Sequence, residues 1–392
     1  MKRILALVLC TAFLLVGCSS AGSSSALPVA ANPQPTPTPT PEPTPSPTVR
    51  FSASGDNLIH GSIYLQAQRR TSDGSYDFGP LYENVAYFYA EQDLNFINQE
   101  TLVSDELEPS HYPLFCSPGE VARECYDLGF RLFGTSNNHI YDKGAEGISS
   151  TLRFWDSMPE DVLISGLWEN GGEDAIPLYE KDGITFALLA YTQYTNGIPT
   201  PQGSPAHVIL TSETDLIQSQ IEQANELADV VLVSVHWGNE DSHAVTDGQR
   251  SLAQQMADWG ADLIIGTHPH VLQGAEWLDR SDGGRSFVAY SLGNFVSAQS
   301  RPDQLIGAVF GCTFQKNANG ETELLEPCFY PTVTHYGAGY SDIKVYFLSD
   351  YNAELAQAHG VRSDYPYFNA EYIQQVVAEN LPGEYLAQSK AA

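Results

Sequence analysis

The chain has few positively charged side chains. Its 392 residues include 18 Lys plus Arg against 48 Asp plus Glu, which gives a formal charge of −30. Nucleic-acid binding without sequence preference depends on Lys and Arg that neutralise phosphates, so we expect no nucleic-acid partner. An anionic substrate would also be repelled unless its binding site supplies concentrated positive charge.

Beyond the N-terminus the sequence lacks an apolar run long enough for a transmembrane helix. Lys2 and Arg3 precede the apolar segment Ile4 to Val16, which is too short to span a membrane comfortably. The segment ends in Leu15-Val16-Gly17-Cys18, which resembles a bacterial lipobox. We therefore predict a lipoprotein signal peptide over residues 1–18 and an extracytoplasmic protein anchored to the bacterial cell membrane by lipid on Cys18. The alternative is an ordinary secretory signal in which Cys18 has no such role.

Proline excludes regular secondary structure from the next segment, residues 19–48. From Pro33 to Pro47 every second residue is proline, and the rest of the segment is rich in Ser and Thr. Alternating proline cannot supply the backbone donors of a helix or sheet and favours extended polyproline II. The composition predicts a disordered stalk, which at about 3.1 Å per residue would extend roughly 50 Å between Pro33 and Thr48.

The sequence also lacks a CxxC motif, so a zinc knuckle is not supported. Four cysteines lie beyond Cys18, and in an exported domain they suggest disulfides. Sequence alone allows three complete pairings, of which we favour the local pairs Cys116–Cys125 and Cys312–Cys328.

From residue 49 onward, strand-like and helix-like runs alternate. Apolar residues make up 42% of the chain and aromatic residues 11%, which is enough to fill a sizeable core. Apolar runs typical of buried strands cover 49–54, 94–97, 130–133, 184–190, 230–235, 262–265 and 287–290. Helical spacing covers 81–89, 121–128, 246–259 and 370–380. This alternation predicts a layered α/β domain over residues 49–392.

Polar side chains gather just beyond the ends of these strands. They are Asp56, Asn98, Glu100, Asn138, His139, His236, His268 and His270. Ligands bind at the carboxyl ends of strands in open α/β sheets, so we expect these residues to converge. Imidazole, carboxylate and amide oxygen together suit a divalent metal such as Mn²⁺, Fe²⁺ or Zn²⁺.

Taken in order, the motifs GD, NxE, NNH, HWG, THPH and YSLGNF resemble the CapA family of capsule (poly-γ-glutamate) synthesis proteins. That family is related to the calcineurin-like metallophosphoesterases. The resemblance covers about residues 50–300, and its most specific part is GTHPHVLQG followed by YSLGNFV. It implies a metallophosphatase-like four-layer α/β/β/α sandwich with a centre of two divalent metal ions at the strand ends.

The resemblance also implies roles for individual residues. Asp56 and His270 would bind the first metal, and Asn138, His236 and His268 the second. Glu100 takes the place of the bridging acid, with Asn98 as the competing candidate. The histidine that follows the first aspartate in the phosphatases is missing here, and His60 is a possible substitute. His139 matches the catalytic histidine that meets the substrate.

Two functions remain open at this point. One is a metal-dependent hydrolase acting on a phosphoester or an amide-like polymer bond. The other is a non-catalytic accessory factor that binds an anionic polymer and works with other capsule-synthesis components. Glu240 and Asp241 follow HWG, and either orient a ligand histidine or are solvated loop carboxylates.

Overall fold

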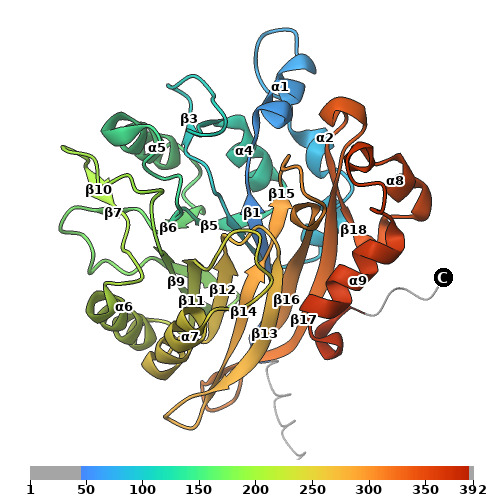
Figure 1. Ribbon diagram of the computed structural model, residues 1–392. Helices are drawn as coiled ribbons and strands as arrows, with labels where there is room; N and C mark the ends of the chain where they lie inside the picture. The colour runs from blue at the N-terminus through green and yellow to red at the C-terminus, as the bar shows by residue number, and fades with distance from the viewer. Residues whose placement is uncertain (1–45, 388–392) are drawn as a thin grey trace, which may run out of the picture. The chain divides into compact units, whose positions relative to one another are not determined.

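A computed structural model describes residues 46–387 of the chain. Contacts unite the described residues into one compact unit. The predicted signal peptide, Cys18 and nearly all of the predicted stalk lie outside the described residues. Among residues 46–387, no helix combines the length and apolar character needed to cross a membrane. The predicted α/β class is confirmed, since helices pack against two large sheets (Figure 1).

The larger sheet has eight strands. Strands β1, β2, β5 and β6 run parallel to one another, β15 pairs parallel with the end of β1, and β16 to β18 continue the sheet antiparallel. Their bounds are β1 Thr48–Asn57, β2 Leu94–Asn98, β5 Phe130–Gly134, β6 Leu163–Ser165, β15 Asn294–Val296, β16 Ile306–Lys316, β17 Thr322–His335 and β18 Lys344–Phe347. The parallel part therefore brings the ends of β1, β2 and β5 to one edge.

The second sheet has six strands in the order β13-β14-β12-β11-β9-β8. Its centre, from β9 to β14, is parallel, and β8 and β13 are antiparallel edges. The bounds are β8 Leu178–Lys181, β9 Ile184–Thr192, β11 Val230–His236, β12 Leu263–Thr267, β13 Leu272–Asp279 and β14 Arg285–Leu292. Two short pairs complete the strands: β3 Val103–Ser104 with β4 Ser117–Pro118, and β7 Trp168–Glu169 with β10 Ala206–His207.

The side chains of β9 alternate between two hydrophobic clusters. Phe186 and Leu188 belong to the main core, which includes Phe51 of β1, whereas Ala187 and Leu189 pack in the cluster beneath α6 and α7. This alternation is the period-two pattern of a strand buried on both faces. The six-stranded sheet therefore faces the eight-stranded sheet on one side and two helices on the other (Figure 1).

Helices flank both sheets. Helix α3 reaches the eight-stranded sheet from the side away from Phe51, where its Tyr89 hydroxyl meets Ser54 at 2.7 Å. The α-helices are α1 Gly61–Arg69, α2 Gly79–Tyr82, α3 Ala86–Tyr89, α4 Glu120–Asp127, α5 Gly144–Asp156, α6 Thr214–Leu227, α7 Asp247–Trp259, α8 Ala353–Ala358 and α9 Ala370–Asn380. Short 3₁₀ helices cover Pro302–Leu305, Ala338–Tyr340, Leu348–Asp350, Gly360–Ser363 and Gly383–Tyr385.

Two local predictions differ from the structure. The single helix expected over 81–89 is two short helices, α2 and α3, although its predicted apolar face is buried. The disulfide pairs are wrong, because all four cysteines are free thiols. Cys125 lies in the main core and Cys116 in a separate cluster around Leu102 and Ile148, which keeps that pair apart. Cys312 is buried in the main core, whereas Cys328 is partly exposed.

Because Gly266 has no side chain, the end of β12, which leads into the loop with His268 and His270, can lie close to β14. A Cβ atom on Gly266 would lie 1.9 Å from the Tyr290 carbonyl oxygen and 2.7 Å from Nε1 of Trp237. Real Cβ atoms do not approach backbone oxygen so closely, so any larger residue must displace β14.

We predict that Gly266→Ala lowers the free energy of unfolding by about 3 kcal/mol, at the upper end of overpacking costs. Gly274→Ala on neighbouring β13 is the matched control, because nothing lies within 4 Å of its Cβ. Urea unfolding followed by circular dichroism measures both variants. Equal midpoints for the two would contradict the close approach.

Candidate metal centre

Five strands from the two sheets deliver the predicted ligands to one place. Asp56 lies at the end of β1, Glu100 follows β2 and Asn138 follows β5, all in the eight-stranded sheet. His236 ends β11, and His268 and His270 follow β12 in the six-stranded sheet. A hydrogen bond joins the two edges: the backbone N–H of His268 donates to the side-chain oxygen Oδ2 of Asp56 at 3.1 Å. The site is thus built at the carboxyl ends of strands from both sheets.

Glu100 is shared by two buried groups of ligand atoms. One group is Glu100, His236 and His268, and the other is Asp56, Glu100 and His270. In each group the three atoms lie within 4.8 Å of one another. His236 Nε2 is 3.5 Å and His270 Nε2 is 3.7 Å from the same oxygen, Glu100 Oε1. This geometry places Glu100 between the two groups, so that it would contact both if each held a cation.

Both carboxylate oxygens of Glu100 are buried without a hydrogen-bond donor among the described residues. Burial raises the pKa of Glu100 well above its ordinary value, and the nearby Asp56 carboxylate raises it further. Asn98, the competing candidate for the bridging position, instead donates its amide to Asp56 Oδ1 at 2.7 Å. The Asn98 amide nitrogen thus orients Asp56, while the Asn98 side-chain oxygen, like both oxygens of Glu100, is buried without a donor. Of the two residues, only Glu100 belongs to the groups of ligand atoms around the histidines.

Hydrogen bonds fix how the ligands of the second group face the centre. The Tyr194 hydroxyl donates to the Gly238 carbonyl, so it accepts from His268 Nε2, which lies 2.8 Å away. His268 Nδ1 therefore carries no hydrogen and has a free lone pair. It lies 3.0 Å from His236 Nε2. Asn138 donates its amide nitrogen to Asn196, which turns its oxygen to within 3.0 Å of His236 Nε2.

These separations fit ligands of a single metal ion. Two ligand atoms at about 2.1 Å from one ion are about 3.0 Å apart at a right angle and about 3.4 Å apart at the tetrahedral angle. The observed distances of 3.0 Å and 3.5 Å around His236 Nε2 match them. Burial lowers the pKa of His268 to about 3 and that of His236 well below its ordinary value. Both imidazoles are therefore neutral, which metal coordination requires.

His270 faces the two carboxylates. Burial alone would lower the pKa of His270, but Glu100 and Asp56 outweigh it and raise the pKa to about 10. Its Nδ1 lies 3.0 Å from the Asn294 side-chain oxygen. Both His268 (φ 96°) and His270 (φ 60°) have left-handed backbone conformations, which non-glycine residues rarely adopt. Such strain often occurs where surrounding structure holds a functional side chain in place.

His139 lies beside the centre and has its own carboxylate partner. Its Nδ1 donates to Asp142 Oδ2 at 2.8 Å, and the Phe115 N–H donates to the same oxygen at 2.6 Å. The Phe115 ring packs edge-on against the imidazole, with 4.7 Å between ring centroids. This arrangement fixes the ring and leaves Nε2 as the atom able to carry a proton toward a ligand.

The possible ligand His60 belongs to neither buried group. Its Nδ1 lies 3.3 Å from the Ala298 nitrogen and 3.2 Å from the Leu58 oxygen, so backbone groups occupy that atom. Of the two acids after HWG, Asp241 contacts Arg301 and Gln304. Glu240 instead offers an oxygen within 4.8 Å of ligand atoms on His268 and His270.

Three residues that hydrogen-bond the histidines of the site were not predicted from the sequence. Asp142 follows His139 by three residues, Tyr194 follows strand β9, and Asn294 lies in the YSLGNF motif. The strand-end rule that selected the ligands also points to Tyr194, two residues beyond Thr192. Asn294 lay inside a recognised motif to which no role was assigned. Nothing in the local pattern around Asp142 marks it as the partner of His139.

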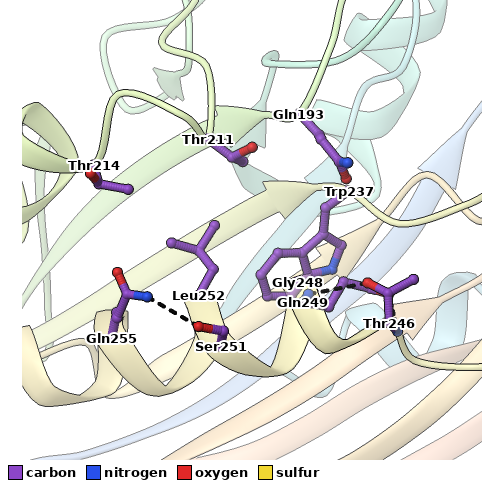
Figure 2. A pocket seen from close by; sticks show the side chains of 10 residues that line it. All are labelled: Gln193, Thr211, Thr214, Trp237, Thr246, Gly248, Gln249, Ser251, Leu252 and Gln255. Carbon is purple, nitrogen blue, oxygen red and sulfur yellow. Dashed lines mark hydrogen bonds between the residues drawn. The ribbon is translucent and has the colours of Figure 1, made fainter.

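A pocket of about 250 Å³ lies near the start of α7 and is lined mostly by uncharged polar side chains, none of them a candidate ligand (Figure 2). Trp237, the neighbour of His236, borders it with its indole largely buried. Its Nε1 donates to the Tyr290 carbonyl at 3.0 Å. Trp237 thus packs on the far side of β11 from the metal ligands and supports the strand end that carries His236.

Comparison with known families agrees with this arrangement. Residues 50–299 match the family model described as bacterial capsule synthesis protein PGA_cap, and this segment contains every ligand named above. The chain belongs to the PGA_cap family. The resemblance to CapA is therefore confirmed.

Curated relatives of this PGA_cap chain include two from Bacillus. The PGA biosynthesis protein CapA of Bacillus subtilis (strain 168) is 31% identical over 206 residues, 52% of each chain. The capsule biosynthesis protein CapA of Bacillus anthracis is 32% identical over 186 residues, 46% of this chain and 43% of the relative. The chain thus spans about half the length of the curated relatives it matches. Among solved structures, the NAD nucleotidase NadN of Haemophilus influenzae gives a TM-score of 0.43 at 12% identity, covering 88% of this chain and 65% of that chain.

We predict that Glu100→Gln weakens Mn²⁺ binding at least tenfold, because both buried ligand groups use this carboxylate. The stabilisation by Mn²⁺ should then fall by about 1.4 kcal/mol, since ligand stabilisation follows the dissociation constant. Urea unfolding with Mn²⁺ and with a chelator measures the difference. Glu106→Gln, at an exposed ion pair with Arg153, should keep the wild-type response. An unchanged response in Glu100→Gln would remove Glu100 from the centre.

Proposed function

We propose that this PGA_cap protein is an extracytoplasmic, lipid-anchored, metal-dependent hydrolase that takes part in capsule or poly-γ-glutamate synthesis. The observation that carries the proposal is the shared position of Glu100, whose two buried oxygens lack donors and whose neighbours are neutral histidine and amide acceptors. A cation at this position would satisfy these acceptors together. The substrate that we propose for this hydrolase is a phosphoester. The other substrate class open to metal-dependent hydrolysis here is an amide-like polymer bond.

The residues fit two divalent ions of the Mn²⁺, Fe²⁺ or Zn²⁺ type. Asp56, Glu100 and His270 would hold one ion, and Glu100, Asn138, His236 and His268 the other. When bound, such ions supply Lewis acidity to a substrate oxygen and lower the pKa of water. The concentrated positive charge would also attract an anionic group to a protein of net charge −30.

His139 supplies the proton in this proposal. Because Nδ1 donates to Asp142, Nε2 is available to protonate a leaving oxygen or to donate a hydrogen bond to developing charge. Asp142 is itself held by the Phe115 N–H, so the imidazole is oriented before substrate arrives. The edge of the Phe115 ring shields one side of the imidazole from water. A carboxylate–histidine pair with one free nitrogen is the arrangement that general acid catalysis needs.

The alternative is a non-catalytic polymer-binding or assembly factor that keeps the metal site. The PGA_cap family and the names of the Bacillus relatives support a role in capsule synthesis without specifying turnover. A binding factor needs the ligands but has no use for the fixed His139–Asp142 pair, and that pair favours hydrolysis.

We predict that the purified protein hydrolyses an aryl phosphate or aryl phosphodiester with added Mn²⁺, and that chelation abolishes the activity. His139→Ala should lower kcat by roughly 10²–10⁴-fold, the usual contribution of a general acid, with metal content unchanged. His207→Ala is the control, because His207 contacts Asn170 and Glu173 and belongs to none of the ligand groups. Two bound ions with no turnover in the wild type would favour the binding factor instead. Equal rates in His139→Ala and wild type would exclude the proposed acid.

Membrane attachment through Cys18 is the remaining part of the proposal, supported by the lipobox-like sequence. The lipid would hold the protein at the surface rather than thread it through the membrane. We predict that Cys18→Ser moves the protein from the membrane fraction to the soluble fraction of a bacterial host, measured by immunoblot after ultracentrifugation. Retention of Cys18→Ser in the membrane fraction would contradict lipid anchoring at this residue.

A further inference from the structure

The loop after β11 is fixed at both of its ends. At Gly238, the N–H donates to Gln193 Oε1 at 2.8 Å and the carbonyl accepts from the Tyr194 hydroxyl. Three residues later, the Asp241 N–H donates to the Pro269 carbonyl at 2.9 Å. The Asp241 carboxylate accepts from Arg301 at 2.7 Å and from Gln304 at 2.6 Å. The loop is therefore attached directly to the THPH turn that carries His268 and His270.

Between these attachments, Glu240 extends toward the two histidines. One of its oxygens lies within 4.8 Å of ligand atoms on both His268 and His270. Glu240 is exposed, whereas Glu100 and both histidines are buried. Glu100 thus approaches the two cation positions from inside the protein, and Glu240 approaches the same two histidines from solvent.

We propose that Glu240 is a further metal ligand, which closes the centre on its solvent side. The proposal rests on the two-ion centre proposed above and adds an oxygen ligand that the sequence resemblance did not supply. The first-ion group contains only Asp56, Glu100 and His270, because Asn57 and Leu58 occupy the positions after Asp56 where the resemblance expects a histidine. His60, the possible substitute, belongs to neither buried group, and its Nδ1 contacts backbone atoms of Leu58 and Ala298. Glu240 is the remaining acid beside His270.

The chemistry of the position favours coordination over simple orientation of a histidine. His268 Nε2 is already occupied by Tyr194, and His270 Nδ1 by Asn294. Carboxylate oxygen completes the shells of Mn²⁺ and Zn²⁺ in proteins. Opposite ligands of one ion are separated by about 4.2 Å when each lies at about 2.1 Å. A spread within 4.8 Å therefore allows Glu240 to share an ion with either histidine after a small side-chain rotation.

The test is a Mn²⁺ titration of the full, chelator-stripped protein, with free Mn²⁺ followed by its electron paramagnetic resonance signal. Glu240→Gln keeps the size of the side chain and removes the ligand charge. Asp247→Asn is the matched control, because it removes an exposed carboxylate seven residues along the same segment that lies in none of the ligand groups. Urea unfolding in chelator checks that both variants fold as stably as wild type.

We expect Glu240→Gln to weaken the more loosely bound Mn²⁺ at least tenfold and Asp247→Asn to leave it within twofold of wild type. Equal affinities in Glu240→Gln and wild type would overturn the proposal while leaving the two-ion centre intact. An equal loss in both variants would also overturn it, because a distant charge would then suffice. A wild-type protein that binds no Mn²⁺ would overturn the centre and the role of Glu240 together.

Discussion

A buried carboxylate without hydrogen-bond donors is the constraint on which the centre depends. Desolvating an ion costs several kcal/mol even after relaxation, and Glu100 has no donor among the described residues to offset that cost. The neighbouring Asp56 makes the cost larger, since two carboxylates then share one dry site. These two carboxylates in turn raise the pKa of His270 to about 10, against the effect of its burial. A cation between Glu100 and the neutral His236 and His268 would satisfy the remaining acceptors.

The two-sheet core makes this arrangement possible. Ligands from β1 and β2 face ligands from β11 and β12 because both sheets end their parallel strands at the same edge. Glycines at two points let the backbones meet: a Cβ on Gly55 would lie 2.0 Å from the Gly293 oxygen, and Gly266 is equally close to Tyr290. The left-handed conformations of His268 and His270 store strain of order 1–3 kcal/mol each, which a large buried core can offset.

Strand ends were predictable because strands buried on both faces have uninterrupted apolar runs in the sequence. The polar residues that follow these runs mark the edge of the sheet where ligands bind. That rule selected Asp56, Glu100, His236 and His268 without knowledge of distances. It could not place His60, whose position depends on backbone contacts with Leu58 and Ala298, or show that Cys116 and Cys125 lie in different clusters. Asp142 contacts His139 within a loop, where no periodic pattern predicts such a contact. The sequence did single out Glu240, but it could not tell that Glu240 lies near both His268 and His270, because that depends on how two loops pack.

The choice between a hydrolase and a polymer-binding factor depends on the role of His139, whose orientation is fixed beside the candidate metal centre. Polymer binding requires only that positive charge overcome the repulsion from an acidic protein, and bound metal ions would provide it without His139. Orienting His139 through Asp142, and Asp142 through the Phe115 N–H, uses two further buried hydrogen bonds and serves no ion. Asp142 also keeps one oxygen buried without a donor, a cost that binding alone would not need. A proton donor held beside the centre before substrate arrives would account for that cost, because general acid catalysis needs the donor within hydrogen-bond reach of the leaving oxygen.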